Sequence, residues 1–172
     1  MIKSVKGKEV MQDKALSMTS EELLELSHED LSFALLSRCE QDSETSDTQS
    51  VLKAIGGVKR TYYTIYLFDM EIQNGGLCQF FSNSTYALAP YVSEELKKLG
   101  AVELAELYDG FCTRNNINPD DLSSFYSDSK DGYLAQTERY PFDEFDNAYN
   151  STGDGELSDL LFDYAVQHID EF

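Results

Sequence analysis

The sequence VLKAIGGVKRTYYTIYLFDMEI, residues 51–72, is largely apolar and decides the fold class. Its run TYYTIYLF, residues 61–68, has the β-branched and aromatic composition of a strand. Apolar residues nevertheless recur at helical spacing, and the stretch from Val58 to Gln73 is too long for an ordinary strand. We therefore predict a helix there, central and buried because it is apolar on nearly every side. Asn74-Gly75-Gly76 is expected to end it, since glycine accepts a positive φ at a helix terminus.

Signals for helix starts recur along the rest of the chain, as capping side chains or as prolines suited to a first helical turn. They lie at Thr19, Ser27, Ser93, Asn118, Pro141 and Asp154. The helix predicted at Asn118 extends through Phe125. The last helix has an apolar stripe of Leu157, Leu160, Leu161, Tyr164 and His168. No regular alternating pattern of strands is present, so the sequence predicts an all-α fold, a single compact multi-helix domain.

The chain length of 172 residues fits one domain, which we place at residues 18–172 behind a flexible basic arm, residues 1–17. Residues 41–50, QDSETSDTQS, are expected to form a polar loop. Cys39, Cys78 and Cys112 are an odd number without short spacing, which favours reduced, buried thiols.

No stretch is apolar enough to cross a bilayer, and the basic N-terminus lacks the apolar segment of a signal peptide. We therefore expect a cytoplasmic protein.

Negative charge is concentrated at the C-terminal end of the chain. Residues 101–172 carry 17 acidic side chains against three basic ones, and so account for −14 of the formal charge of −19. Large aromatic residues are interleaved with these acids, whereas a disordered acidic tail has few aromatics. The aromatics can anchor helices to a core, which would fix the carboxylates on a rigid surface. Such a surface repels nucleic acid and membranes and attracts basic proteins.

The carboxylates of this segment are the candidate partner-binding residues. We select Asp120, Asp121, Asp128, Asp131, Asp143, Glu144, Asp146, Glu156, Asp159 and Asp163. Acids one turn apart on a helix are separated by about 5.4 Å along its axis, against about 3.4 Å of axial rise between phosphates on a DNA strand. Two neighbouring helices would approach the phosphate density. The sequence offers two candidates for such a paired row, namely the last two helices and the group of Asp120, Asp121, Asp128 and Asp131.

Candidate catalytic residues are few, so we predict that the protein is not an enzyme and needs no cofactor. His168 lies on the apolar stripe of the last helix, where a hydrogen-bonded core histidine is expected, and His28 is expected at the surface. Asp120, Asp128 and Asp131 do not have the spacing of an EF-hand loop, so no metal site is predicted.

The string EIQNGGLCQFFSN, residues 71–83, is the most distinctive motif. It favours a structural role: a helix end, a tight glycine turn and two phenylalanines in the core, with Gln79 and Asn83 satisfying backbone groups. A pocket formed by Glu71, Asn74 and Gln79 is the functional alternative.

The pattern E-x-x-N-G-G-x-x-Q-F-F-x-N in this string resembles the signature of a bacterial family of small helical proteins whose best-described member is an acidic DNA mimic. The resemblance covers residues 51–115, and the length and charge balance resemble those of the mimic. It implies an all-α homodimer whose carboxylates imitate phosphates and occupy the DNA-binding surface of a helix-turn-helix transcription regulator.

Other interpretations remain. The charge can serve solubility alone, as in many acidic proteins. The same surface would suit an immunity or antitoxin-type protein that covers a basic nuclease. An enzyme with a pocket near the NGG turn is the third possibility.

Overall fold

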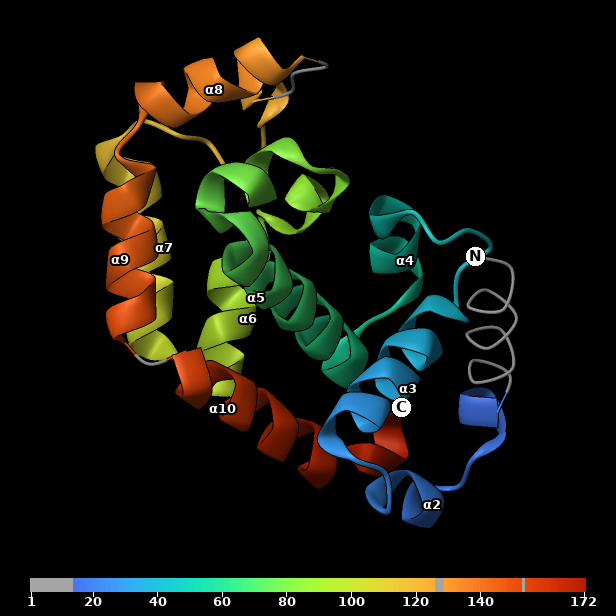
Figure 1. Cartoon of the computed structure of the whole chain (residues 1–172). Helices are drawn as coiled ribbons and strands as arrows, with labels where there is room; N and C mark the ends of the chain where they lie inside the picture. Colours follow the sequence, from blue (N-terminus) through green and yellow to red (C-terminus); the bar gives the residue numbers. More distant parts are fainter. Residues whose placement is uncertain (1–13, 126–128, 153) are drawn as a thin grey trace. The chain divides into compact units, whose positions relative to one another are not determined.

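The computed structural model describes residues 14–125, 129–152 and 154–172, and all regular secondary structure in these ranges is helical (Figure 1). The α-helices are α2 (Ser20–Leu24), α3 (His28–Glu40), α4 (Thr48–Ala54), α5 (Gly57–Ser82), α6 (Val92–Leu99), α7 (Val102–Arg114), α8 (Lys130–Arg139), α9 (Phe142–Ser151) and α10 (Asp154–Gln167). Short 3-10 helices are η1 (Ser84–Leu88), η2 (Ser123–Phe125) and η3 (Ile169–Glu171). The predicted all-α class is confirmed.

The chain forms two compact units. The first unit comprises residues 1–63 and 162–172, and the second unit comprises residues 64–161. The boundaries fall inside α5 and α10, so both helices contribute to both units. The extent of the predicted domain, residues 18–172, stays a prediction.

The helix starts predicted in the first unit are present. Thr19 and Glu22 form the expected capping box, with the Glu22 N–H donating to Thr19 Oγ1 at 3.3 Å and the Thr19 N–H donating to Glu22 Oε2 at 2.8 Å. Ser27 caps α3 in the same way by accepting from the Asp30 N–H. These contacts satisfy backbone donors that an α-helix leaves open at its start.

Arg38 of α3 forms hydrogen bonds with the backbone at residues 15 and 18, near the end of the predicted arm. Its Nε donates to the Ala15 carbonyl oxygen at 3.0 Å and its Nη2 donates to the carbonyl oxygen of Met18. Burial lowers the pKa of this guanidinium group. Residues 14–17 are helical and Ala15 is buried, while residues 1–13 of the arm lie outside the described residues.

The predicted loop over residues 41–50 is partly wrong, because α4 begins at Thr48. Asp47 is its N-cap and accepts from the Ser50 N–H at 3.0 Å. Hydrogen bonds from Thr45 and Ser50 lower the pKa of Asp47 to about 2. Asp47 is a typical N-cap residue, but it lies within a polar run that otherwise indicates a loop, so the sequence pattern does not reveal this short helix.

The central helix is present, and it ends at the glycines as predicted. α5 runs from Gly57 to Ser82, and only Gly75 and Gly76 depart from helical geometry. Its middle, residues 61–68, is buried apart from Tyr66. Met70, which the spacing places on the apolar stripe, is 46% exposed. The glycines therefore end the buried central helix, and a second helical segment follows them to Ser82.

Aromatic side chains fill the core of the second unit. Those buried there are Phe68, Phe80, Phe81, Tyr108, Phe111, Phe125, Phe142, Phe145 and Tyr149. The ring centroids of Phe68 and Phe80 are 5.1 Å apart, and those of Phe81 and Phe125 are 5.2 Å apart. The aromatics between the C-terminal acids thus anchor their helices, as predicted.

The predicted helix from Asn118 through Phe125 is wrong. Asn118 Oδ1 accepts from the Asp120 N–H at 3.2 Å, which forms a side-chain-closed turn, and only η2 follows. Asparagine favours such turns as well as helix caps, because its side chain can bond either backbone arrangement. α8 has no counterpart among the predicted helices.

The helix start predicted at Ser93 is wrong by one residue, because α6 begins at Val92 with Tyr91 as its N-cap, whereas the remaining predicted limits are confirmed. α6 ends at Gly100, which adopts the left-handed conformation at φ 90°. α9 follows Pro141, and α10 begins at Asp154. Within residues 14–125, 129–152 and 154–172, none of the helices combines the length and hydropathy that a bilayer span requires.

Candidate protein-binding surface

Most of the candidate carboxylates lie at the surface, on elements that follow α7. Those that are exposed form what we call the acidic set: Asp120, Asp121, Asp131, Asp143, Glu144, Asp159 and Asp163. Asp128 and the side chain of Glu156 lie outside the described residues. Asp146 is half-buried and has a different environment.

Helix geometry helps to place the acidic set. Asp131 lies in the first turn of α8, and Asp143 and Glu144 lie in the first turn of α9. Negative charge is favourable there, because the backbone N–H groups and the helix dipole are positive at a helix start. α10 carries Asp159 and Asp163 about one turn apart.

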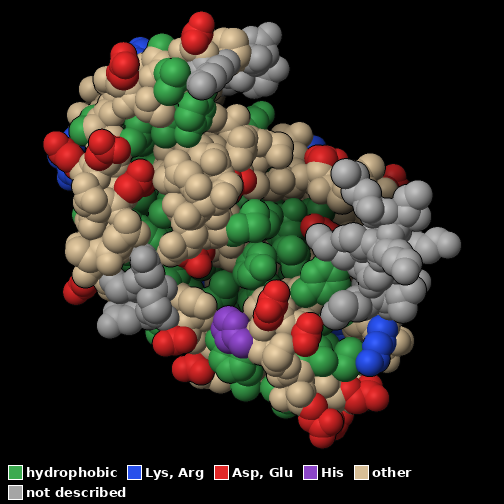
Figure 2. Space-filling model, viewed as in Figure 1, with side chains coloured by type: hydrophobic (Ala, Val, Ile, Leu, Met, Phe, Trp, Pro, Cys, Tyr) green, Lys and Arg blue, Asp and Glu red, His purple; other side chains and the backbone are tan. Residues whose placement is uncertain are grey.

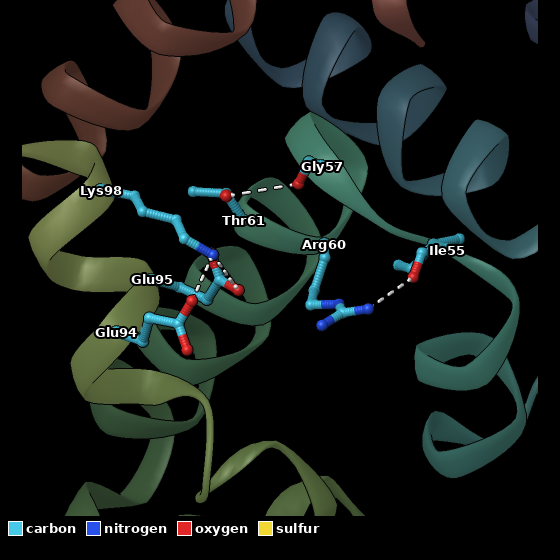
Figure 3. Close-up of polar contacts among 7 residues, drawn as sticks. All are labelled: Ile55, Gly57, Arg60, Thr61, Glu94, Glu95 and Lys98. Carbon is cyan, nitrogen blue, oxygen red and sulfur yellow. Dashed lines mark hydrogen bonds and ion pairs between the residues drawn. The ribbon is translucent and has the colours of Figure 1, made fainter.

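The acidic set is not neutralised by basic side chains. In the part of the chain that the structure describes, no member forms an ion pair. The ammonium group of Lys98 lies between the carboxylates of Glu94 and Glu95, 2.7 and 3.1 Å from their oxygens (Figure 3). Lys97 pairs with Asp109 at 3.0 Å. These lysines thus neutralise acids outside the set, and among the described residues the acidic set remains available to a partner.

Arg60 and Thr61, at the start of α5, donate to nearby backbone. Arg60 Nη2 donates to the carbonyl oxygen of Ile55 at 3.3 Å, and the Thr61 hydroxyl donates to that of Gly57 at 3.4 Å (Figure 3).

Asp121 is the member of the acidic set with the most defined geometry. The Ser123 hydroxyl donates to Asp121 Oδ1 at 2.6 Å and the Ser123 N–H donates to the same oxygen at 3.2 Å. These hydrogen bonds lower the pKa of Asp121. The carboxylate is therefore ionised at neutral pH, with one oxygen already fixed.

The expected paired row on the last two helices stays a prediction. α9 packs beside α7 (Figure 1). Figure 2 shows acidic side chains over the region of α8 and α9.

Asp146 serves the fold of the second unit. Its Oδ1 accepts from the Leu77 N–H at 2.9 Å, so it joins α9 to the glycine kink of α5. Burial raises the pKa of Asp146, the Leu77 hydrogen bond opposes this increase, and the negative charge of Asp143 adds to it. The half-buried carboxylate is thus engaged within the chain, unlike the acidic set.

The raised pKa of Asp146 predicts a pH-dependent contribution to stability. The folded protein holds this proton to a higher pH than the unfolded chain, so the wild type should lose stability relative to Asp146→Asn as the pH rises from about 3.9 through the folded pKa. Urea unfolding of both proteins at a series of pH values measures the difference. A difference that stays constant over this range would contradict the assignment.

The signature string forms a polar cluster, the Glu71 cluster, of Glu71, Gln79, Asn83 and Thr85. Glu71 Oε2 accepts from Gln79 Nε2 at 2.8 Å and Asn83 Nδ2 at 2.9 Å, and Oε1 accepts from the Thr85 hydroxyl at 2.9 Å. Glu71 is only 6% exposed. Gln79 and Asn83 thus bond a buried carboxylate and not the backbone groups expected from the sequence.

The pocket suggested by Glu71, Asn74 and Gln79 is only partly assembled. Glu71 and Gln79 meet in the Glu71 cluster, while Asn74 is exposed near the kink. The carboxylate oxygens are directed toward donors of the chain itself. This arrangement favours the structural interpretation of the string.

Of the predictions for the two histidines, the one for His28 is correct and the one for His168 is wrong. His28 is exposed, as predicted, and stacks on Phe162 with 4.6 Å between ring centroids. The expectation of a core His168 is wrong, because its side chain is 37% exposed and its Nδ1 is 2.8 Å from Glu171 Oε1. The α10 helix simply ends before this position.

All three cysteines are buried and free, as predicted. Burial raises the pKa of Cys39 and of Cys112 to about 12, and it also raises the pKa of Cys78. A thiol with a raised pKa is a poor nucleophile, so these residues act as small apolar side chains in the core.

Fold and surface together define an acidic, all-α protein with a kinked central helix. The elements after α7 carry a set of exposed carboxylates that form no ion pair within the described ranges. The chain belongs to the family described as DMP19-like protein, which it matches over residues 53–168. The match extends beyond the resemblance seen at residues 51–115 and includes α8 and α9. No curated protein and no solved structure matches the chain.

Proposed function

We propose that the protein is a DNA mimic. Its surface carboxylates occupy the DNA-binding surface of a helix-turn-helix transcription regulator and stop the regulator from binding its operator. The observation that supports this most directly is the acidic set: seven exposed carboxylates on the elements after α7, without an ion pair among the described residues.

The charge spacing is compatible with a phosphate decoy. Asp159 and Asp163 are four residues apart, which corresponds to about 6 Å along the axis of α10. This is sparser than the phosphates of one DNA strand, which rise by about 3.4 Å each. The acids of α8 and α9 add further charges on separate elements. A basic partner would meet several anions at once, as it does on DNA.

A homodimer would extend the array. A two-fold axis presents the same surface twice, and dimeric helix-turn-helix proteins place their recognition helices about 34–36 Å apart. Sedimentation equilibrium of the purified protein measures the oligomeric state. A monomer at all accessible concentrations would remove this part of the proposal.

The experiment that tests the function is capture and displacement. The tagged protein is incubated with its native cell extract, the bound protein is identified, and the release of labelled operator DNA from that protein is measured at increasing salt concentration. We expect release at low salt and a steep loss with rising salt, because exposed charge pairs are screened. Capture of a basic nuclease whose activity is blocked would instead support an immunity protein.

The substitutions Asp159→Asn with Asp163→Asn are expected to weaken partner binding about five- to thirtyfold at low salt, because two exposed charge interactions are lost. Isothermal titration with the captured partner measures the change, and circular dichroism checks that the fold is kept. Glu21→Gln with Glu25→Gln on α2 is the matched control, since both residues are exposed and the net charge changes equally. Equal losses in both variants would mean that net charge, not the C-terminal surface, governs binding.

A further inference from the structure

A pocket in the second unit is lined in part by Ser123, whose hydroxyl donates to Asp121. Five residues line it, Phe81, Ser82, Tyr86, Leu122 and Ser123, and its volume is about 280 Å³. We call it the anchor pocket. Pockets that hold drug-sized ligands measure roughly 300–1,000 Å³, so this one suits a single side chain better than a small molecule.

The walls of the anchor pocket combine an apolar floor with an exposed aromatic ring. Phe81 and Leu122 are 1% and 3% exposed, and they form the buried floor. Tyr86 of η1 is 47% exposed, which is unusual for so large a side chain in a well-packed unit. The Tyr86 ring is therefore available to a partner.

The polar groups of the anchor pocket favour a cation with several donors. Ser82 Oγ is buried and makes no hydrogen bond to an oxygen or nitrogen of the described residues, although the weakly polar Cys78 thiol lies beside it. Ser123 connects the pocket to Asp121 through the 2.6 Å hydrogen bond of its hydroxyl. The Asp121 carboxylate thus places a negative charge at the pocket edge, with one oxygen oriented by Ser123.

We propose that the anchor pocket receives one arginine side chain of the basic partner. The aliphatic part of arginine suits the Phe81 and Leu122 floor, and its planar guanidinium group can stack on the Tyr86 ring. The donors of the guanidinium group can bond the exposed Asp121 carboxylate, one oxygen of which Ser123 already orients. Lysine has a compact ammonium group that stacks poorly, so the pocket selects arginine over lysine. This inference rests on the proposed function, in which the partner presents a basic surface.

The Glu71 cluster fixes the backbone that carries one wall of the anchor pocket. Asn83 and Thr85, which flank the start of η1, are bonded to the Glu71 carboxylate. The Tyr86 N–H donates to the Asn83 carbonyl oxygen at 3.0 Å, which fixes the backbone that carries the ring. On the other side, Gln136 Nε2 donates to the Ser124 carbonyl oxygen at 2.6 Å and steadies the segment with Ser123. An aromatic anchor held in this way binds with little loss of conformational entropy.

The test uses two fluorescent peptides of equal length and charge, one of alternating glycine and arginine and one of alternating glycine and lysine. Anisotropy at low salt measures their affinities for the full chain. We expect the wild type to bind the arginine peptide about fivefold more tightly. Tyr86→Ala should abolish this preference and leave the affinity for the lysine peptide within about twofold, while Tyr86→Phe should keep the preference because the ring remains.

Asp143→Asn is the matched charge control for Asp121→Asn. Both substitutions remove one exposed carboxylate, but Asp143 lies on α9 and does not line the pocket. We expect Asp121→Asn to weaken the arginine peptide more than the lysine peptide, and Asp143→Asn to weaken both equally. The anchor-pocket proposal is wrong if the wild type binds both peptides equally, or if the Tyr86→Ala protein still prefers the arginine peptide. Neither result would contradict the proposed function. Failure of both peptides to bind at low salt would count against the proposed function itself.

Discussion

The substitution Gly76→Ala is expected to lower the free energy of unfolding by about 4 kcal/mol, the largest effect of any single change considered. Gly76 adopts φ 77° and ψ −178°, a backbone region open almost only to glycine, where another residue costs about 1–3 kcal/mol. An added Cβ would also lie well inside van der Waals distance of Asp146 Oδ2. Asp146 would then lose its hydrogen bond to the Leu77 N–H, which adds about 1–3 kcal/mol. Urea unfolding measures the sum.

Gly100→Ala separates the two causes of this loss. Gly100 also has a positive φ, 90°, but a Cβ there would meet nothing within 4 Å. It should therefore cost only the backbone strain, about 1–2 kcal/mol. Similar losses for Gly76→Ala and Gly100→Ala would show that the contact with Asp146 adds nothing, and that α9 is not tied to the kink through this carboxylate.

The same kink shows where sequence reasoning succeeds and fails for the fold. Residues 51–72 carry enough apolar periodicity to predict a buried helix, because burial on all sides is a local property of the sequence. Beyond the glycines, Asp146, which lies 69 residues from Leu77, supplies an acceptor for the Leu77 N–H. The two glycines predict the helix end correctly, whereas this long-range contact could not be predicted from the local pattern.

The candidate surface shows a similar division. Exposure of Asp143 and Glu144 follows from the helical period of α9, in which Phe142, Phe145 and Tyr149 point to the core. The same period places Asp146 four residues after Phe142, on the inward stripe, so its half-buried position could have been predicted. We assigned it to the partner-binding residues because of its charge alone.

The anchor pocket had no such signal in the sequence. Tyr86 and Ser123 are 37 positions apart, and neither lies in a recognisable motif. Their meeting depends on how η1 and the turn after α7 pack on Phe81. Charge pattern thus predicts that a basic partner binds, whereas the location of a pocket for one of its side chains requires the tertiary structure.

The substitution Glu71→Ala is expected to lower the free energy of unfolding by about 3 kcal/mol. It removes the acceptor of Gln79, Asn83 and Thr85, and donors that lose their partner in a buried site cost about 1–3 kcal/mol each before relaxation. Gln79 and Asn83 can recover part of this by turning to water, because they are not fully buried, whereas Thr85 is only 7% exposed. Urea unfolding measures the loss.

Gln73→Ala, two positions along the same helix at an exposed site, is the control and should change stability by less than about 0.5 kcal/mol. Because the Glu71 cluster fixes the start of η1, a milder substitution, Glu71→Gln, should also reduce the preference for the arginine peptide while the chain stays folded. A Glu71→Gln protein with full stability and an unchanged arginine preference would show that the signature string neither supports the fold nor positions Tyr86. In that case the buried Glu71 carboxylate would need another explanation. The alternative that the sequence offers is a reactive site near the NGG turn.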